Sequence, residues 1–438
     1  MIMKRTLVLS GGGTKGIYEC GAIRALMDLN KFHFDRIIGV SVGALNAAML
    51  VQGDFEKMEE LYDTLEPSMI VNGFIPVDQT LFSILKEREE FHDQLNYYLK
   101  EGGIDVRPFY KMVDKYYEPD KFFASTIDFG CVVAKKKDHS GVYVDKKMMK
   151  EHGKEWLIAS AAAYPAFPVC TIDGIDYVDG GYYDNFPIDY ALQKGTEEII
   201  GIEMGKTPLH DLYMHKRKIH IIHPHTEIFS FLNFDHEKMH RAKIMGYNDT
   251  MKEFGIYDGE RYTFNKFSVY QEFERELHVM FLLENRIKNC NLLNEIHGSE
   301  HVISDQLMEQ LGKPFLTDKD YIFGMLDALL ELCDSDETKV YTIQEAKYRI
   351  LAFFASAADK DYSYVPKLRP SDMIAFAKTL DRKGRVSRMI HGMLYPNHKI
   401  FSDKILLTIY PFETALAIFI TMMMKELAGE EKNGYCKI

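Results

Sequence analysis

The residue of this sequence that is best placed for catalysis is a serine flanked by glycines. Ser41 is the centre of a Gly-x-Ser-x-Gly pentapeptide that begins at Gly39 and ends at Gly43. An apolar run, residues 37–40, leads into it, and an alanine-rich, helix-favouring segment follows. This order predicts a strand, a sharp turn and a helix, with the serine hydroxyl exposed at the turn and the glycines relieving steric crowding. We expect Ser41 to be a nucleophile, although a tight turn without catalysis has the same local pattern.

A glycine-rich loop follows the first strand-like segment, residues 6–10. The loop contains Gly11, Gly12, Gly13, Lys15 and Gly16. Its spacing fits a dinucleotide site, but such a site expects an acidic residue at the end of the second strand, where this chain has Ser41. Its backbone N–H groups, at the start of a helix, would also suit an oxyanion hole beside Ser41. Both functions stay open on the spacing alone.

The third candidate feature is an aspartate that could accept a proton. Such a neighbour is needed because a serine hydroxyl is a weak nucleophile until its proton is accepted. Asp179, followed by Gly180 and Gly181, comes directly after a strand-like run. An ordinary Asp-Gly turn has the same pattern. Histidine usually activates a serine, but five later histidines crowd one region without a preferred candidate: His210, His215, His220, His223 and His225. A Ser–Asp pair without histidine therefore becomes attractive.

A metal signature also occurs, in the His-Glu-x-x-His spacing of His236, Glu237 and His240. This spacing is typical of zinc proteases. No clear third ligand follows, so we expect no metal and no other cofactor.

Two strand–loop–helix units in the first fifty residues predict an α/β fold with a parallel sheet. A helical insertion is expected at about residues 54–117, with Phe74, Ile75, Leu81 and Phe82 lining an acyl channel. The remaining elements expected in this half are strands at residues 122–134, 141–144, 169–172, 175–178, 198–203 and 219–222, and helices at residues 156–163 and 237–251.

The pattern becomes almost entirely helical after about residue 255. Helices are expected at residues 271–288, 318–332, 343–358, 372–380 and 405–427. With 438 residues, the chain is too long for one ordinary core, so we expect two domains, 1–255 and 256–438. Pro411 and Glu413 interrupt the apolar residues 405–424, which favours a buried helix or helix pair over a membrane span.

Composition narrows the class of partner. The formal net charge of −12 disfavours a general affinity for nucleic acid or for an anionic membrane. Six scattered cysteines form neither a disulfide framework nor a metal pattern, and the N-terminal apolar run is too short for a secretory signal. We expect a cytoplasmic location; a peripheral membrane contact stays open, and nothing indicates the oligomeric state.

Four blocks, in order, resemble the patatin-like phospholipase family: residues 11–16, 39–43, 159–168 and 179–187. Residues 241–247 also fit the closing helix of that family, so the resemblance covers about residues 5–250. It implies a three-layer α/β fold with a mainly parallel central sheet, followed here by an all-helical C-terminal domain.

The resemblance further implies a cofactor-free lipid acyl hydrolase of phospholipase A, lysophospholipase or esterase type. Ser41 would be the nucleophile that carries the acyl group, and Asp179 the general base. The N–H groups of Gly11, Gly12 and Gly13 would form the oxyanion hole, with that of Val42 contributing. Lys15 stands where many members carry arginine, and we assign it no catalytic role. A nucleotide-binding enzyme, or a scaffold acting through residues 256–438, remains the alternative.

Overall fold

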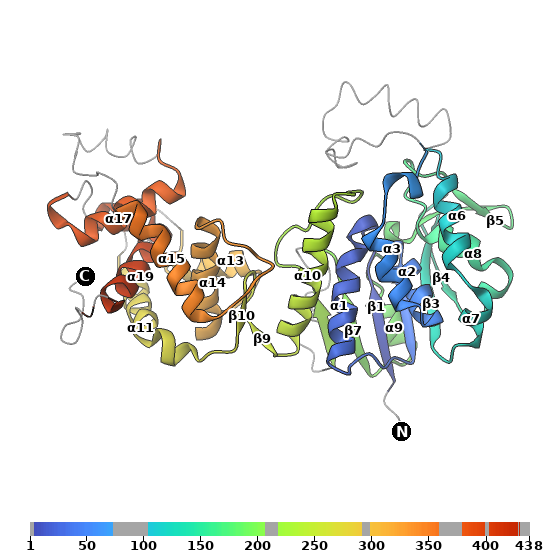
Figure 1. Ribbon diagram of the computed structural model, residues 1–438, viewed down its shortest axis with the longest axis horizontal. Helices are drawn as coiled ribbons and strands as arrows, with labels where there is room; N and C mark the ends of the chain where they lie inside the picture. Colours follow the sequence, from blue (N-terminus) through green and yellow to red (C-terminus); the bar gives the residue numbers. More distant parts are fainter. Residues whose placement is uncertain are drawn as a thin grey trace. The chain divides into compact units, whose positions relative to one another are not determined.

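The structure is a computed structural model that describes residues 4–72, 104–205, 218–290, 298–358, 379–398, 403–427 and 429. The chain forms two compact units, Met1–Gly255 and Ile256–Ile438 (Figure 1). Each unit is described by itself below.

The first unit is built on one eight-stranded sheet. Its strands are β1 (Arg5–Leu9), β2 (Arg36–Val40), β3 (Asp128–Lys135), β4 (Gly141–Asp145), β5 (Cys170–Ile172), β6 (Ile175–Asp179), β7 (Glu198–Ile202) and β8 (Ile219–Ile222). The order is β5-β6-β3-β2-β1-β7-β8, with β4 also paired to β3. Five strands, β3, β2, β1, β7 and β8, pair parallel with their neighbours in that order. The pairs β3–β4, β3–β6 and β5–β6 are antiparallel. The predicted mainly parallel sheet is confirmed.

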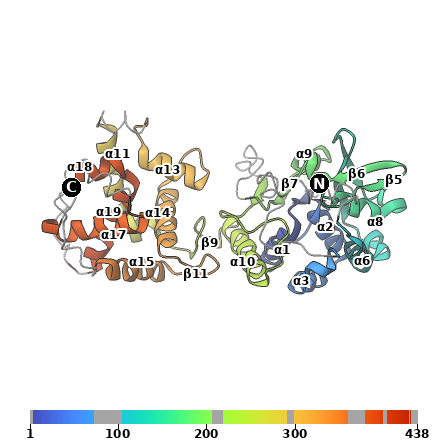
Figure 2. The same cartoon turned by 90° about the horizontal axis from the view of Figure 1, so that it is seen from above.

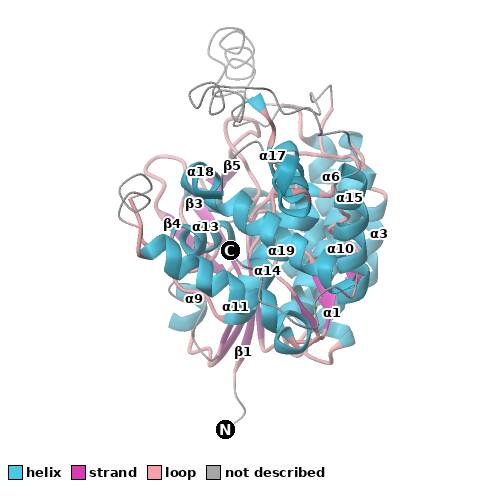
Figure 3. Cartoon of the chain, turned by 90° about the vertical axis from the view of Figure 1, so that its left-hand side faces the viewer, coloured by secondary structure: helices cyan, strands magenta, loops and turns pink. Residues whose placement is uncertain are grey.

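Helices cover both faces of this sheet and make the predicted three layers. They are α1 (Gly16–Asp28), α2 (Val42–Gln52), α3 (Phe55–Asp63), α6 (Arg107–Tyr116), α7 (Pro119–Ala124), α8 (Met149–Ser160), α9 (Ile188–Gln193) and α10 (His236–Glu253). Figure 2 shows α9 on one side of the sheet and α1, α3 and α10 on the other, and Figure 3 sets the strands apart by colour.

The strand residues explain the layers, because successive side chains point to opposite faces. Leu7 and Leu9 of β1 pack into the core beneath α1 and α2, while Val8 between them packs with residues of α9. All three are fully buried. A parallel strand covered on both faces therefore reads as a continuous apolar run, as it does here.

In this unit, two predicted elements differ from the structure and one prediction falls outside the described residues. Residues 122–124 belong to α7 and not to a strand, since Pro119 at the first helical position starts a helix there. The helix predicted at residues 156–163 begins earlier and ends at Ser160. The insertion contributes α3 and α6, but Phe74, Ile75, Leu81 and Phe82 lie outside the described residues.

The second unit is helical, with its own buried core. Its helices are α11 (Val269–Lys288), α13 (Val302–Leu311), α14 (Asp318–Leu332), α15 (Ile343–Ala358), α17 (Arg382–Leu394), α18 (Asp403–Ile409) and α19 (Pro411–Leu427). It also contains a small sheet that the pattern did not predict, of β9 (Tyr257–Asp258), β10 (Thr263–Asn265) and β11 (Val340–Tyr341). The helix predicted at residues 372–380 falls mostly outside the described residues.

The apolar segment near the C-terminus is a helix pair, as predicted. α18 ends at Ile409 and α19 begins at Pro411, and most of α19 is buried in the core of the second unit. Within the described residues, no helix combines the length and the apolar character needed to span a bilayer.

Candidate active site

Ser41 occupies a strained turn between β2 and α2. Its φ of 56° and ψ of −126° lie where residues other than glycine are rarely found. The two glycines of the pentapeptide are required by close packing: a Cβ at Gly39 would lie 2.1 Å from the Gly43 carbonyl oxygen, and one at Gly43 would lie 2.5 Å from the Ser10 carbonyl oxygen. The predicted strand–turn–helix around Ser41 is therefore present.

Ser160, the last residue of α8, fixes this turn by hydrogen bonds. The Ser41 N–H donates to Ser160 Oγ at 3.0 Å, and the Ser160 hydroxyl donates to the Val132 carbonyl oxygen at 2.8 Å. Ser160 is fully buried. The strained backbone of Ser41 is thus tied through one hydroxyl to the neighbouring strand β3.

Asp179 is the last residue of β6 and lies beside Ser41. The Ser41 hydroxyl lies near enough to its carboxylate to lower the pKa of that group by hydrogen bonding, and the Gly181 N–H donates to Asp179 Oδ1 at 2.8 Å. The Asp179 N–H in turn donates to the Ala162 carbonyl oxygen at 2.8 Å. Gly180 allows the chain to pass close to β3, because a Cβ there would lie 2.1 Å from the Val132 carbonyl oxygen.

The electrostatics of Asp179 suit a proton acceptor. Burial raises its pKa from 3.8 to about 6, while the hydrogen bonds from Ser41 and Gly181 oppose that shift. The carboxylate is therefore ionised at neutral pH but is a stronger base than an exposed aspartate. Catalytic bases are most effective with a pKa near the working pH.

The glycine-rich loop lies next to Ser41, since a Cβ at Gly11 would be 3.1 Å from the Ser41 Cβ. The Gly11 N–H donates to the Asn185 carbonyl oxygen at 3.3 Å, and Asn185 Nδ2 donates to the Gly11 carbonyl oxygen at 3.2 Å. By contrast, the N–H groups of Gly12 and Gly13 donate to no acceptor in the part of the chain that the structure describes. These two groups are therefore available to a bound oxyanion, and that of Gly11 is already engaged.

The same loop leaves little room for a dinucleotide. The Thr14 N–H donates to the Phe231 carbonyl oxygen at 3.0 Å, and a Cβ at Gly13 would lie 2.1 Å from that oxygen. A pyrophosphate needs backbone N–H groups at the helix N-terminus. Here the chain around Phe231 takes up the Thr14 N–H itself.

Lys15 and Gly16 are the last two residues of the glycine-rich loop. Burial lowers the pKa of Lys15, which the charge of Glu227 partly offsets. A Cβ at Gly16 would lie 2.1 Å from Tyr62 Oη, so this glycine lets α1 approach α3.

An apolar pocket opens beside Ser41. Its unfilled space, including the mouth, is about 680 Å³. The lining residues are Gly13, Thr14, Ser41, Val42, Leu45, Asn46, Met49, Leu61, Tyr62, Leu65, Ile70, Phe109, Met112, Ala161, Phe167, Phe231 and Leu232. Most of these side chains are apolar, so the pocket suits a hydrocarbon chain whose reacting end lies at Ser41.

Two polar side chains in this wall, Tyr62 and Asn46, belong to a buried hydrogen-bond network. Tyr62 donates to Asn46 Oδ1 at 3.0 Å, and Asn46 Nδ2 donates to Glu19 Oε2 at 2.7 Å. Burial raises the pKa of the Glu19 carboxyl well above its ordinary value, against the hydrogen bond from Asn46. This network ties α1, α2 and α3 together beneath the pocket.

The histidines do not join Ser41. Among the described residues, none hydrogen-bonds to Ser41 or Asp179; His210 and His215 lie outside that part of the chain. His236 Nε2 contacts Glu66 Oε1 at 3.1 Å, and His220 Nδ1 contacts Glu253 Oε1 at 2.8 Å. The described chain also contains no group of three or more His, Cys, Asp or Glu side chains that could hold a metal ion.

Sequence reasoning missed two residues that assemble the site, Ser160 and Asn185. Both lie in the blocks quoted above, but no role was assigned to them. A small polar residue within an alanine-rich block was the only signal for Ser160. Their partners, Val132 and Gly11, are distant in sequence and become neighbours only in the folded sheet.

Residues 7–192 match the family model described as patatin-like phospholipase. No curated protein matches the chain. Among solved structures, VipD from Legionella pneumophila matches with 14% identity and a TM-score of 0.39, over 99% of this chain and 92% of that one. ExoU, in its complex with SpcU from the type III secretion system of Pseudomonas aeruginosa, matches with 15% identity and a TM-score of 0.30, over 98% and 90%.

The predicted resemblance to the patatin-like phospholipase family is thus confirmed over residues 7–192.

Proposed function

We propose that the protein hydrolyses fatty acyl esters of lipids, with Ser41 as nucleophile and Asp179 as general base. The observation that carries this proposal is the position of Ser41, which lines an apolar pocket and lies beside the Asp179 carboxylate. The strain at Ser41, the raised pKa of Asp179 and the two available N–H groups of the glycine loop are independent features of the same site.

In the first half of the reaction, Ser41 Oγ forms a bond to the ester carbonyl carbon while its proton passes to Asp179. The carbonyl oxygen becomes an oxyanion, which the N–H groups of Gly12 and Gly13 stabilise, with that of Val42 in the first turn of α2. The intermediate then collapses. The alcohol or lysolipid leaves with the proton from Asp179, and the acyl group stays on Ser41.

In the second half, water takes the place of the alcohol. Asp179 accepts a proton from water as the water oxygen attacks the acyl carbon, and the oxyanion forms again at the same N–H groups. Collapse breaks the bond to Ser41 Oγ, which recovers its proton from Asp179. The fatty acid is released, and the enzyme returns to its starting state.

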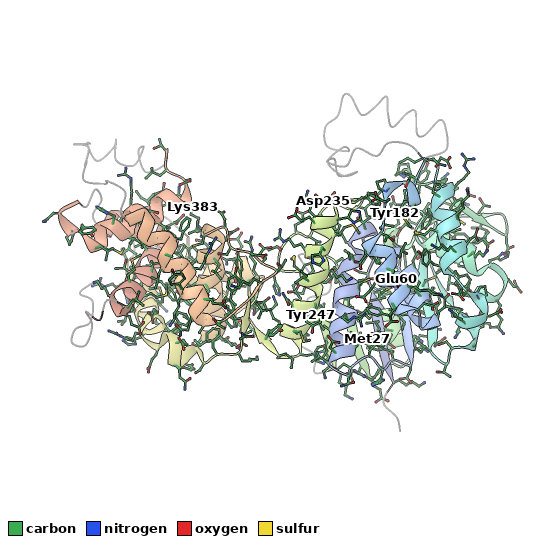
Figure 4. The ribbon with its side chains drawn as sticks, viewed as in Figure 1. Met27, Glu60, Tyr182, Asp235, Tyr247 and Lys383 are labelled. Carbon is green, nitrogen blue, oxygen red and sulfur yellow. The ribbon has the colours of Figure 1, made fainter. Side chains whose placement is uncertain are left out.

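The lining of the pocket supports a fatty acyl substrate of the phospholipase A, lysophospholipase or esterase type. Two exposed tyrosines next to the site support peripheral contact with a lipid surface. Tyr182, labelled in Figure 4, and Tyr183 follow the Asp179 turn and have exposures of 48% and 51%. Tyrosine rings suit such an interface, with one end apolar and the other in water.

Activity profiling tests the proposal. The wild-type protein is incubated with a mixed lipid extract, and released fatty acids and lysolipids are read by mass spectrometry. We expect Ser41→Ala to abolish release while the fold persists, and Ser140→Ala, a serine in the turn after β3, to behave as wild type. Equal release by Ser41→Ala and wild type would exclude Ser41 as the nucleophile.

A further inference from the structure

A second cavity lies behind the pocket at Ser41. It has about 310 Å³ of unfilled space, including its opening to solvent, and its lining residues are Leu45, Ala48, Met49, Leu61, Met112, Val113, Tyr116, Tyr117 and Leu157. Four of these residues, Leu45, Met49, Leu61 and Met112, also line the first pocket. The two cavities are therefore neighbours that share one wall.

We propose that the two cavities form one acyl slot, and that the shared wall sets the acyl length that the enzyme accepts. The first cavity would take the part of the chain nearest the ester, and the second would take the remainder of a long chain. This inference rests on the proposed function and adds the residues that determine its specificity.

The direction of the slot follows from α2, the helix that begins immediately after Ser41. Val42, Leu45 and Met49 line the first cavity and are spaced by three and four residues, which places them along one face of the helix. From Val42 to Met49 the helix rises roughly 10 Å at about 1.5 Å per residue. Ala48 and Met49 then line the second cavity, so the apolar path leads from the nucleophile along α2.

The opposite side of the slot is made by α3 and α6. Leu61 is buried, whereas the adjacent Glu60, labelled in Figure 4, is exposed, so α3 turns its apolar face inward. On α6, Met112 lines both cavities and Val113 lines only the second. Leu157 of α8 lines the second cavity as well.

Two of the four shared residues are methionines, and this makes the wall adaptable. Methionine is unbranched, with three rotatable bonds, and it fits irregular apolar gaps better than leucine or valine. Met49 is buried and Met112 is half-buried. A rotamer change at these two side chains would join the cavities without moving a helix.

The two cavities predict how activity depends on chain length. Each methylene that becomes buried contributes about 0.8 kcal/mol, or about fourfold in kcat/KM when the gain appears in the transition state. Short acyl chains use only the first cavity. Longer chains gain further only if the second cavity is open to them.

The experiment measures kcat/KM of the full-length protein for nitrophenyl butyrate, octanoate and palmitate, and compares the ratio of palmitate to octanoate. Ala48→Leu places extra volume in the second cavity alone, and we expect it to lower this ratio about sixteenfold, as for the loss of two buried methylenes. Met112→Ala removes part of the shared wall and raises the ratio. Met112→Leu keeps the volume and leaves the ratio within about twofold of wild type.

Leu157→Phe fills the second cavity from α8 and replaces Ala48→Leu if that variant does not fold. A ratio that is unchanged in a folded filling variant, or that falls in Met112→Ala, overturns the two-cavity slot while leaving hydrolysis by Ser41 intact. An absence of Ser41-dependent hydrolysis for every ester overturns the proposed function, and this inference with it.

Discussion

At the scale of single residues, Asp179 combines two opposing requirements. Its carboxylate is 7% exposed, and burial raises its pKa to about 6. A buried charge lowers the stability of the folded state, yet the same burial makes the carboxylate a stronger base towards Ser41. The site therefore trades stability for basicity at one side chain.

The pH dependence of activity follows from this pKa. Below about pH 6 Asp179 is protonated and cannot accept the proton of Ser41, so kcat/KM falls about tenfold per pH unit on the acid side. Initial rates with nitrophenyl butyrate across the acid and neutral range measure the pH at which kcat/KM begins to fall. A limb near the ordinary carboxyl pKa of 3.8 would mean that the base is an exposed carboxylate and not Asp179.

Asp179→Asn should lower the activity of the protein but raise the stability of its folded state. The folded-state pKa is above the unfolded value of 3.8, so the carboxylate costs stability at pH values above about 6, by about 3 kcal/mol. We expect Asp179→Asn to be more stable than wild type by about this amount in mildly alkaline buffer. The difference shrinks as the pH falls through 6 and disappears below 3.8.

Urea unfolding at both ends of this pH range measures the effect. Asp176→Asn, in the same strand but with an exposed side chain, is the matched control and should change stability little at either pH. An Asp179→Asn protein that is less stable than wild type in alkaline buffer would show that the hydrogen bonds of the carboxylate outweigh its desolvation.

At the scale of the elements, one short segment connects both halves of the site. Residues 159–168 comprise the last two residues of α8 and the segment after it; the Ser160 hydroxyl accepts from the Ser41 N–H, and the Ala162 carbonyl accepts from the Asp179 N–H. Ala161 and Phe167, in the same segment, line the pocket. The block therefore positions the nucleophile, the base and the acyl group together.

The sequence predicted the local parts of this arrangement and not its cross-links. The pentapeptide around Ser41 and the turn after Asp179 depend on nearby glycines, so their conformations could be inferred from adjacent residues. The contacts of Ser160 with Val132, and of Asn185 with Gly11, depend on which strands become neighbours. A linear pattern carries no signal for such pairs.

Ser160→Ala tests this cross-link. The substitution leaves the buried Ser41 N–H and Val132 carbonyl without a partner, which costs about 1–3 kcal/mol of stability. It also frees the strained turn, so we expect kcat for nitrophenyl butyrate to fall about tenfold with KM little changed, because the pocket is intact. Ser160→Cys, which keeps a weak acceptor and donor, should restore part of kcat. A loss of stability with an unchanged kcat would make Ser160 a packing residue alone.

At the scale of the whole molecule, the chain has separate cores. Every residue proposed for the site and the slot lies in the first unit, whereas the core of the second unit is built from its own helices and small sheet. Most helices of the second half were evident from their apolar spacing. The small sheet was not, because strands of two or three residues are too short to show an alternating pattern.

The residues singled out in the sequence as lining of the pocket, Phe74, Ile75, Leu81 and Phe82, lie outside the described residues, so that prediction stays untested. The described lining comes from α2, α3, α6, the segment after α8 and the segment around Phe231. Helical spacing shows which side chains are buried, but not which of them border an unfilled space.

The separation of the cores predicts an independent catalytic unit. We expect a fragment of residues Met1–Gly255 to fold and to hydrolyse nitrophenyl butyrate with a kcat/KM within about threefold of the full chain, since no proposed site residue comes from the second unit. Circular dichroism and esterase assays on both proteins measure this. A folded fragment without activity would assign the second unit a direct part in catalysis.

The central claim is that Asp179 activates Ser41, and covalent labelling tests it most directly. A fluorophosphonate probe is added to wild type and to Asp179→Asn at neutral pH, and the adduct is followed by intact mass and located by peptide mapping. We predict rapid labelling of wild type at Ser41 alone, and labelling of Asp179→Asn that is slower by a hundredfold or more. An adduct at another residue, or labelling of Asp179→Asn at the wild-type rate, would contradict the claim.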